Sequence, residues 1–190
     1  MTIRHMPSIP RRSAVTRHPL TRRARLLATA ARITHDLGLA AWFGGAAMGA
    51  IGLNSATREV DDPAQRIRVA NAGWFRWAPM TGMAIGAHVA GVYGRVRWGR
   101  RSGLVAPGSP LALLRLVLTG LAVGATIESG RSGRQVVAQG DVPVATAVVP
   151  ISDTPDEVAA AMRRLRIVQW IMPLATAGIL AVNALQDDSD

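Results

Sequence analysis

The hydrophobic residues of this chain gather in four long blocks, and the polar and charged residues collect between the blocks. Each block is long enough for a helix to cross a hydrocarbon core of ~30 Å, because an α-helix rises ~1.5 Å per residue. The blocks predict membrane-spanning helices at about residues 37–54, 74–94, 111–127 and 167–185. We therefore predict an all-α membrane protein, a four-helix transmembrane bundle with long second and fourth helices.

The second block gives the most distinct signal, because tryptophans stand at one end of it and arginines at the other. Between Trp77 and Tyr93 the only ionisable side chain is that of His88. Interfacial tryptophan with arginine beyond the span is typical of a membrane helix. The sequence RWAP at 76–79 also returns as QWIMP at 169–173. Related hairpins could explain this similarity, but we favour a shared interfacial belt of tryptophans.

Cap residues followed by proline mark the starts of three helices. Asp62-Pro63, Ser109-Pro110 and Thr154-Pro155 each offer a side-chain N-cap and a proline at the first helical position. The second and fourth helices therefore begin well before the bilayer. Thr21 is predicted to start the first helix, whose amphipathic lead carries arginines on one face and runs into the first span without a break.

The ends of the chain differ from its middle. Residues 1–20 carry four arginines, three prolines and no acid, which predicts a disordered basic arm. A secretory signal peptide is the competing interpretation, but the basic region is too long and Asn54-Ser55-Ala56 is a poor cleavage site. The transmembrane domain is predicted at 21–186, and an acidic tail follows at 187–190.

The segment at 128–154 is rich in glycine, valine and proline. Either a flexible loop or a short hairpin around Gly140-Asp141 fits this composition, and the sequence does not decide between them. The predicted third span therefore ends at residue 127.

Composition narrows the classes of function. Of 190 residues, 49% are hydrophobic and only 4% are aromatic, which disfavours an ordinary water-soluble core. The absence of cysteine excludes a disulfide, a thiolate metal site, an iron–sulfur cluster and a cysteine nucleophile. The sequence has no glycine-rich phosphate loop, paired-carboxylate site or serine nucleophile motif, so we predict no enzymatic activity and no cofactor.

Membrane topology explains the net charge of +10 better than nucleic-acid binding does. Eight arginines precede residue 33, and four more follow the second span. Because arginine-rich segments stay on the cytoplasmic side, the arrangement predicts a multi-pass plasma-membrane protein with both termini cytoplasmic and no nucleic-acid partner. The arginines at 163, 164 and 166 oppose this orientation, although nearby acids offset them.

Small residues recur four apart in three of the spans. The pairs are Gly45 with Gly49, Gly82 with Gly86, and Gly120 with Gly124. Such pairs let helix backbones approach closely, which supplies van der Waals contact in lipid, where hydrophobic burial does not drive helix association. Packing within the chain is the favoured interpretation, and a contact face for a second copy or another membrane protein is the alternative.

Three ionisable residues are the candidates for chemistry. His88 lies inside the second span, and His35 with Asp36 lies at the start of the first. In the predicted orientation all three fall near one leaflet, and ionisable groups within a membrane are functional candidates by default. A proton relay or a metal site is one interpretation. We favour the other, in which Asp36 pairs with Arg32 and a neutral His88 bonds to a neighbouring helix, so no metal site is predicted.

Several of these positions also resemble those of a known family. The segments are HDLGLAAWFGG at 35–45, RWAP at 76–79, AH at 87–88, VQW at 168–170 and NALQ at 183–186. Together they resemble a family of uncharacterised actinobacterial four-helix membrane proteins, over most of residues 33–186. The resemblance implies a multi-pass plasma-membrane location, with no known activity or assigned functional residues. A fainter likeness, at His35, Trp42, Gly44 and Gly45, is to the first helix of copper-resistance D-type membrane domains.

Few polar groups and many close-packing faces favour a non-enzymatic accessory or interaction subunit of the plasma membrane. Its predicted partners are the lipid bilayer and either another membrane protein or a second copy of this chain. The alternative is a small transporter, or an ion- or metal-handling membrane protein, that uses His88, His35 and Asp36. An enzyme that acts on lipid is disfavoured, because the sequence pairs no nucleophile with a base.

Overall fold

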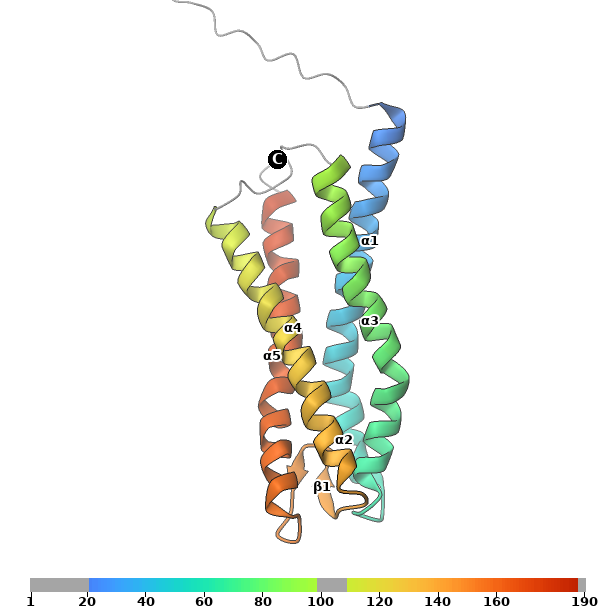
Figure 1. The fold of residues 1–190 in the computed structure, drawn as a ribbon, viewed down its shortest axis with the longest axis vertical. Helices are drawn as coiled ribbons and strands as arrows, with labels where there is room; N and C mark the ends of the chain where they lie inside the picture. Colours follow the sequence, from blue (N-terminus) through green and yellow to red (C-terminus); the bar gives the residue numbers. More distant parts are fainter. Residues whose placement is uncertain (1–20, 99–108, 188–190) are drawn as a thin grey trace, which may run out of the picture.

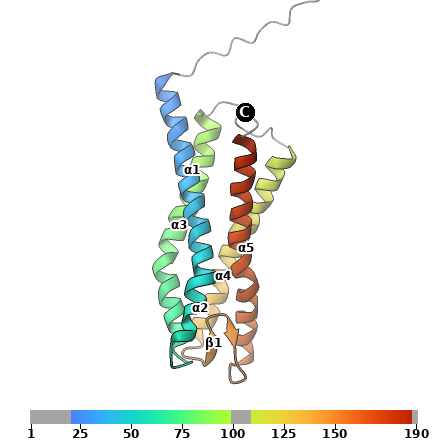
Figure 2. The ribbon, with the colours of Figure 1, turned by 180° about the vertical axis from the view of Figure 1, so that it is seen from behind.

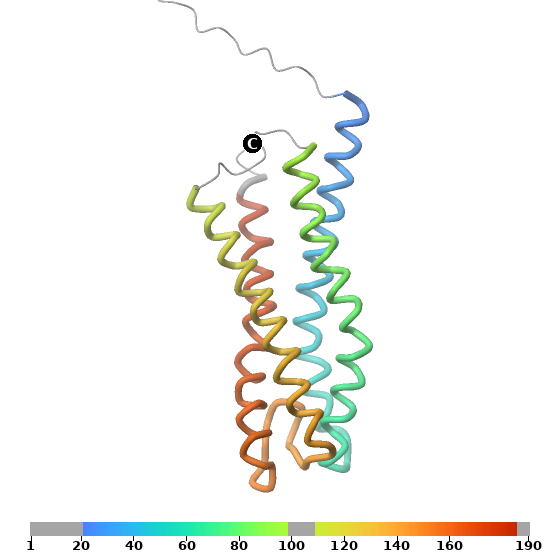
Figure 3. The backbone as a smooth tube through the Cα atoms, viewed as in Figure 1, coloured from blue at the N-terminus to red at the C-terminus, as the bar shows by residue number. Residues whose placement is uncertain are grey.

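The computed structural model describes residues 21–98 and 109–187, which form four long helices and a short β-hairpin. The long helices are α1 (Arg22–Met48), α3 (Arg66–Trp98), α4 (Pro110–Ala138) and α5 (Asp156–Asp187). Successive helices run in opposite directions, so the start of α1 and the end of α5 share one end of the bundle (Figure 3). We call this the upper end, as drawn in Figure 1, and the end with the hairpin the lower end. The predicted basic arm and most of the predicted tail lie outside the described residues.

α1 is the first part of a longer helical rod. A π-helical turn at Gly49–Leu53, the short α2 (Asn54–Ala56) and a 3₁₀ turn at Thr57–Glu59 continue it. The whole rod, Arg22–Glu59, has 38 residues and is ~57 Å long at ~1.5 Å per residue, well beyond the ~30 Å of a hydrocarbon core. The first helix therefore reaches its predicted span without a break, as the sequence indicated.

The predicted cap residues play different parts. The hydroxyls of Thr21 and Ser109 each accept a hydrogen bond at 3.3 Å from the backbone N–H three residues on, as helix N-caps do. The Asp62 carboxylate accepts instead within the turn that precedes α3. The Thr154 hydroxyl donates to the carbonyl of Pro143 at 2.7 Å, so this bond stabilises the loop before α5 rather than the start of the helix.

The four long helices form two pairs. α1 packs against α3 and α4 against α5, and the pairs meet through α1 and α5, which lie side by side in Figures 1 and 2. α3 and α4 make few contacts, because α4 crosses α5 at a slant and nears α3 only toward the lower end (Figure 1). The bundle is therefore closed along α1 and α5 and less tightly packed between α3 and α4.

Glycines, which have no side chain, allow α1 and α3 to pack closely. A Cβ atom placed on Gly91 would lie 2.5 Å from the Cα atom of His35, and one on Gly38 would lie 2.6 Å from the carbonyl oxygen of Ala84. Neither distance is available to a real side chain, so each helix presses glycine against the backbone of the other. Backbone contact of this kind is how helices associate in lipid.

Three of the helices are long and apolar enough to cross a membrane: the Arg22–Glu59 rod, Pro110–Ala138 and Asp156–Leu185. They agree with three of the four predicted spans, and their length and hydropathy indicate a multi-pass membrane protein. α3 has 33 residues but falls outside this set, because His88, Trp77, Pro79 and several glycines lower the mean hydropathy of its central stretch. The span at 74–94 therefore stays a prediction.

Large apolar side chains cover the outside of the bundle. Exposed residues of this kind occur on every long helix, which suits a surface that faces lipid better than one that faces water. They include Leu37 and Met48 on α1, Met80, Met83 and Tyr93 on α3, Leu116 and Leu121 on α4, and Ile167 and Leu174 on α5. In this respect α3 matches the three candidate spans.

α4 is longer than the sequence predicted. It continues to Ala138, so residues 128–138 are helical rather than part of a loop. Glu128 accepts hydrogen bonds from Ser132 on the same helix at 3.0 Å and from Arg164 of α5 at 3.3 Å. The second bond ties this glycine- and serine-rich stretch to α5, and Ser132 and Val136 are buried in the bundle. Tertiary contacts therefore override its weak helix propensity.

The lower end contains a hairpin, but its turn lies further along the chain than predicted. β1 (Val144–Thr146) and β2 (Val149–Pro150) pair antiparallel, with the turn at residues 147–148. Gly140, where the sequence placed the turn, instead follows the end of α4 with left-handed backbone at φ +75°, a conformation that glycine adopts without strain. Val144 packs into an apolar cluster with the ends of α3, α4 and α5, which fixes the hairpin against the helices.

Candidate functional site

Two polar regions lie inside the bundle, and the first is a pair of histidines between α1 and α3. The ring centroids of His35 and His88 are 4.6 Å apart, and the two residues are 0% and 2% exposed. The glycines that bring the helices together also bring the rings together, because Gly91 lies against the backbone of His35 and Gly38 against that of His88. The structure thus joins two residues that the sequence placed only near the same leaflet.

Asp36 extends this pair toward the surface. Its Oδ1 atom lies 2.8 Å from Nδ1 of His35, and its Oδ2 atom lies 3.9 Å from Nε of Arg32, as the sequence predicted. Nε2 of His35 and Nδ1 of His88 are buried and have no hydrogen-bond partner among the described residues. A half-exposed carboxylate beside two buried imidazoles can hold or pass a proton. Within the same residues, no group of three or more His, Asp or Glu side chains could hold a metal ion.

A spacing in the sequence could have indicated this contact. Six residues of the first helix recur at alternating intervals of four and three, the spacing of a helix-packing face. They are Ala31, His35, Gly38, Trp42, Gly45 and Gly49. All are buried or half-buried. A search for glycines four apart finds only the last two of them, which is why the histidine contact was missed.

The second polar region borders a groove of about 380 Å³ between α3 and α4, with α1 and α5 behind it. Its walls are mostly apolar and aromatic. α3 contributes Trp74 and Trp77, α4 contributes Thr126 and Arg134, and Gln169 of α5 stands behind them. Mostly apolar walls with a few placed polar groups are typical of ligand-binding sites in proteins.

Hydrogen bonds between side chains cross the back of the groove. Asn54 Nδ2 donates to Gln169 Oε1, and Trp74 Nε1 donates to Asn54 Oδ1, both at 2.9 Å. Gln169 Nε2 donates in turn to the carbonyl of Arg166 at 3.2 Å. This network joins α2, α3 and α5, and it satisfies amide groups that would be costly to leave unpaired inside the bundle.

A single threonine links three helices beside the groove. Trp42 Nε1 of α1 donates to Thr126 Oγ1 of α4 at 3.2 Å, and this hydroxyl donates to the carbonyl of Ala122 at 2.8 Å. The sulfur of Met172 on α5 lies 3.2 Å from the same oxygen. The sequence analysis singled out ionisable residues and overlooked these neutral ones. A neutral polar residue within an apolar helix is the signal that could have found them.

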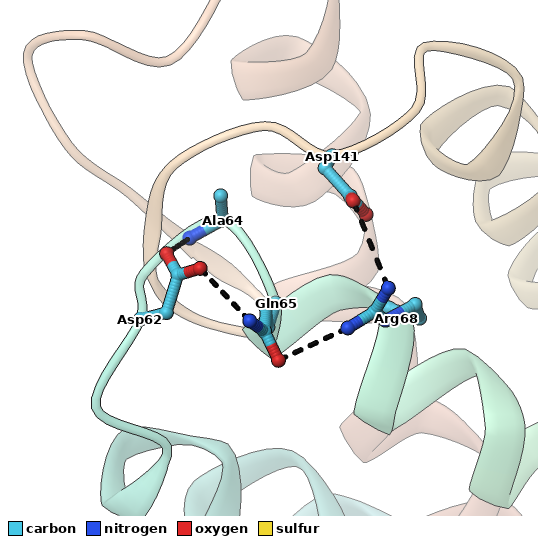
Figure 4. Close-up of polar contacts among 5 residues, drawn as sticks. All are labelled: Asp62, Ala64, Gln65, Arg68 and Asp141. Atoms are coloured by element: carbon cyan, nitrogen blue, oxygen red, sulfur yellow. Dashed lines mark hydrogen bonds and ion pairs between the residues drawn. The ribbon is translucent and has the colours of Figure 1, made fainter.

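Exposed polar contacts connect the start of α3 with the loop after α4 (Figure 4). Arg68 of α3 lies 3.9 Å from the carboxylate of Asp141, in the loop after α4, and donates to Gln65 Oε1 at 3.0 Å. Gln65 Nε2 donates to the Asp62 carboxylate at 3.0 Å. The contacts connect the start of α3 with the end of α4, although exposed ion pairs contribute little stability.

The six glycines predicted to pack helices fall into two groups. A Cβ atom at Gly45 would overlap the ring of Trp77, and one at Gly49 would overlap the ring of Trp74. A Cβ atom at the other four would meet no atom of the described chain within 4 Å; these are Gly82, Gly86, Gly120 and Gly124. The favoured interpretation, packing within the chain, is therefore wrong for these four positions. They lie on exposed faces of α3 and α4.

Comparisons with protein-family models, with curated proteins and with solved structures found no match. The resemblance to actinobacterial four-helix membrane proteins therefore stays a prediction. The histidine pair, the groove and the outward glycines are the features from which a function can be argued.

Proposed function

We propose that this chain is a non-enzymatic accessory or interaction subunit of the plasma membrane, which packs against another membrane protein through α3 and α4. The observation that supports this is the outward position of Gly82, Gly86, Gly120 and Gly124, where an added Cβ would meet nothing within 4 Å in the described chain. Small residues four apart allow a neighbouring backbone to approach closely in lipid. In this proposal a helix of the partner packs on these faces, which no described helix of this chain uses.

α3 is the fourth membrane span in this proposal. It packs backbone to backbone on α1 at Gly38 and Gly91, so the two helices share the same depth. It also exposes Met80, Met83 and Tyr93, which suits contact with lipid. The arginines before the first span and after the second place the upper end in the cytoplasm. Both termini are then cytoplasmic.

Assembly after gentle detergent extraction tests the accessory role. We expect the full-length protein to co-purify with a second membrane protein or a second copy, and the double substitution Gly120→Leu/Gly124→Leu to remove that partner. Leucine side chains would prevent the close approach of a partner backbone that glycine allows. Gly44→Leu is the matched control, because a Cβ at this outward position of α1 also meets nothing within 4 Å. A monomeric, partner-free wild-type particle would contradict the proposal.

A second candidate function is that of a small proton transporter that uses His35, Asp36 and His88. The observation that favours it is the direct contact of two buried imidazoles, one of which lies 2.8 Å from a half-exposed carboxylate. Burying ionisable groups in a membrane bundle is costly, and such groups commonly mark ion or proton pathways.

The substitution His88→Leu separates the two functions. We would measure proton flux in vesicles that enclose a pH-sensitive dye, and assembly in detergent. Lost flux with an intact complex supports proton transport, whereas unchanged flux with weakened assembly supports the accessory role. Gln169→Leu is the control, because Gln169 is also a buried polar residue but bonds to Asn54, away from the histidines.

A further inference from the structure

We propose that the groove between α3 and α4 binds the acyl chain of an anionic membrane lipid, whose phosphate lies beside Arg134. Lipid binding here goes beyond the accessory role: of the four outward glycines only Gly82 lines the groove, and the surrounding bilayer rather than a partner protein fills it. A space of about 380 Å³ beside lipid does not stay empty, since an empty space forfeits the van der Waals contacts of the atoms that line it.

The length of the groove fits one leaflet of a bilayer. On the Arg22–Glu59 rod it is lined from Trp42 to Asn54, a rise of ~18 Å at ~1.5 Å per residue, and both residues lie within the first predicted span. That is about half of a hydrocarbon core of ~30 Å, and so about the depth of one layer of acyl chains. Because α3 and α4 make few contacts, the groove opens between them to the surrounding lipid. An acyl chain can therefore enter from the side without leaving its leaflet.

The polar groups behind the groove already have hydrogen-bond partners. Both ends of the Asn54 amide are bonded, the indoles of Trp42 and Trp74 both donate, and the Thr126 hydroxyl donates to a carbonyl. The Ser129 hydroxyl is buried without a partner in the described chain. Apart from Asn71 and Arg134, which also line the groove, the walls offer few free polar groups to hold water molecules, each of which needs roughly two to four polar partners. The walls therefore suit a hydrocarbon chain, which needs no hydrogen bonds.

The lower end of the groove carries positive charge. Arg134 lines the groove, and no carboxylate of the described chain pairs with it. Two nearby acids are paired with other arginines, Glu128 with Arg164 at 3.3 Å and Asp141 with Arg68 at 3.9 Å. Arginine binds phosphate through two parallel hydrogen bonds. A lipid phosphate beside Arg134 would place its acyl chain at the opening of the groove.

Lipids with bromine on the acyl chain test whether a chain enters the groove, because bromine quenches tryptophan fluorescence on close contact. In the full-length protein carrying Trp98→Phe and Trp170→Phe, the remaining tryptophans are Trp42, Trp74 and Trp77, all of which line the groove. This protein is placed in phosphatidylcholine nanodiscs with a minor fraction of brominated phosphatidylglycerol or of brominated phosphatidylcholine. We expect phosphatidylglycerol, which is anionic, to quench more strongly at the same mole fraction.

The substitution Gly133→Leu is designed to block the groove. Gly133 lines it, and a Cβ there meets nothing within 4 Å, so leucine adds bulk without displacing a neighbour. We expect it to remove the excess quenching by phosphatidylglycerol, whereas Gly44→Leu, on an exposed face of α1 outside the groove, leaves the excess unchanged. Equal quenching by the two lipids, or an excess that survives Gly133→Leu, would mean ordinary surrounding lipid only and would overturn the proposal.

The headgroup contact is tested by Arg134→Gln. We expect the preference for phosphatidylglycerol over phosphatidylcholine to fall about fivefold, the factor that one arginine near an anionic surface supplies. Arg131→Gln is the control, because Arg131 lies on the same helix but does not line the groove. An unchanged preference in Arg134→Gln overturns the proposal. A second result would also overturn it: no lipid-specific quenching, together with a dimer that Gly133→Leu disrupts. The occupant of the groove would then be a second copy of this chain.

Discussion

The two helix pairs of this bundle use small residues in opposite ways. In the α1–α3 pair, a Cβ at Gly91 would run into the backbone of His35 at 2.5 Å. In the α4–α5 pair, the nearest atom to a Cβ at Gly178 would be the end of the Leu118 side chain, at 3.0 Å. The first pair is therefore held by contact between backbones, and the second by side chains that can adjust.

This difference explains where the bundle is closed and where it is open. Backbone contact holds α3 close along α1, and it encloses His35 and His88 so fully that neither is more than 2% exposed. Side-chain contact lets α4 slant across α5, so its upper part stands apart from α3 (Figure 1). Chemistry based on ionisable groups belongs to the closed pair, and binding of apolar partners to the open side.

The largest change in the free energy of unfolding is expected when one methyl group is added at the interface of a helix pair. Gly91→Ala should lower the free energy of unfolding by ~3 kcal/mol, the upper range for overpacking, because the backbone of His35 cannot move aside. Gly178→Ala should change it by less than ~1 kcal/mol, since Leu118 can rotate and alanine is the better helix former. Unfolding of the full-length protein by sodium dodecyl sulfate in mixed micelles measures both.

Gly86→Ala is the control on α3, because a Cβ at Gly86 meets nothing within 4 Å. It should leave stability unchanged or raise it slightly. If Gly91→Ala and Gly178→Ala cost the same, the contrast between backbone contact and side-chain contact does not hold.

The sequence predicted the four helices well because apolar blocks and cap residues are local signals. Thr21 and Ser109 cap as expected, and the polar lead and the apolar block from Ile167 onward form one long helix, as predicted. It could not predict which glycines face a neighbour, because that depends on how the helices are rotated against one another. Gly45 and Gly49 lie on the same face as the histidine of α1, whereas the other predicted pairs lie on outward faces. In the sequence, the inward-facing and the outward-facing glycine pairs have the same spacing of four residues.

The next largest effect concerns the network behind the groove. Asn54→Leu removes the hydrogen bonds to Gln169 and Trp74 and leaves their polar atoms without partners. We expect a loss of ~2 kcal/mol in the free energy of unfolding, within the range for buried polar groups that lose their bonds. The double substitution Asn54→Leu/Gln169→Leu should cost less than the sum of the single ones, because it removes both partners at once.

Asn71→Leu is the matched control for this prediction. Asn71 also lines the groove, but it is half-buried and outside the network. Strict additivity of Asn54→Leu and Gln169→Leu would show that the two amides do not interact in the membrane. The sequence could not predict this network, because it joins positions 115 residues apart.

A smaller effect is expected where one hydroxyl links the two pairs. Thr126→Val keeps the shape of the side chain but removes the bond from Trp42 Nε1. We expect a loss of ~0.6 kcal/mol, the average for side-chain hydrogen bonds within membrane proteins. Thr119→Val is the control, because its hydroxyl bonds only within α4, to the carbonyl of Arg115 at 2.8 Å. A loss in Thr126→Val no greater than in Thr119→Val would show that the bond between α1 and α4 contributes nothing.

The smallest effect is expected at the lower end, where Arg68 faces Asp141 across the mouth between α3 and α4 (Figure 4). The two side chains are 62% and 55% exposed and 3.9 Å apart, so water and salt screen their attraction. Arg68→Gln should therefore cost less than ~0.5 kcal/mol, and that cost should vanish in high salt. Unfolding measured at low and high ionic strength distinguishes the cases. A larger cost that persists in high salt would mean that a fixed contact closes this side of the bundle, contrary to the open side inferred from the slant of α4.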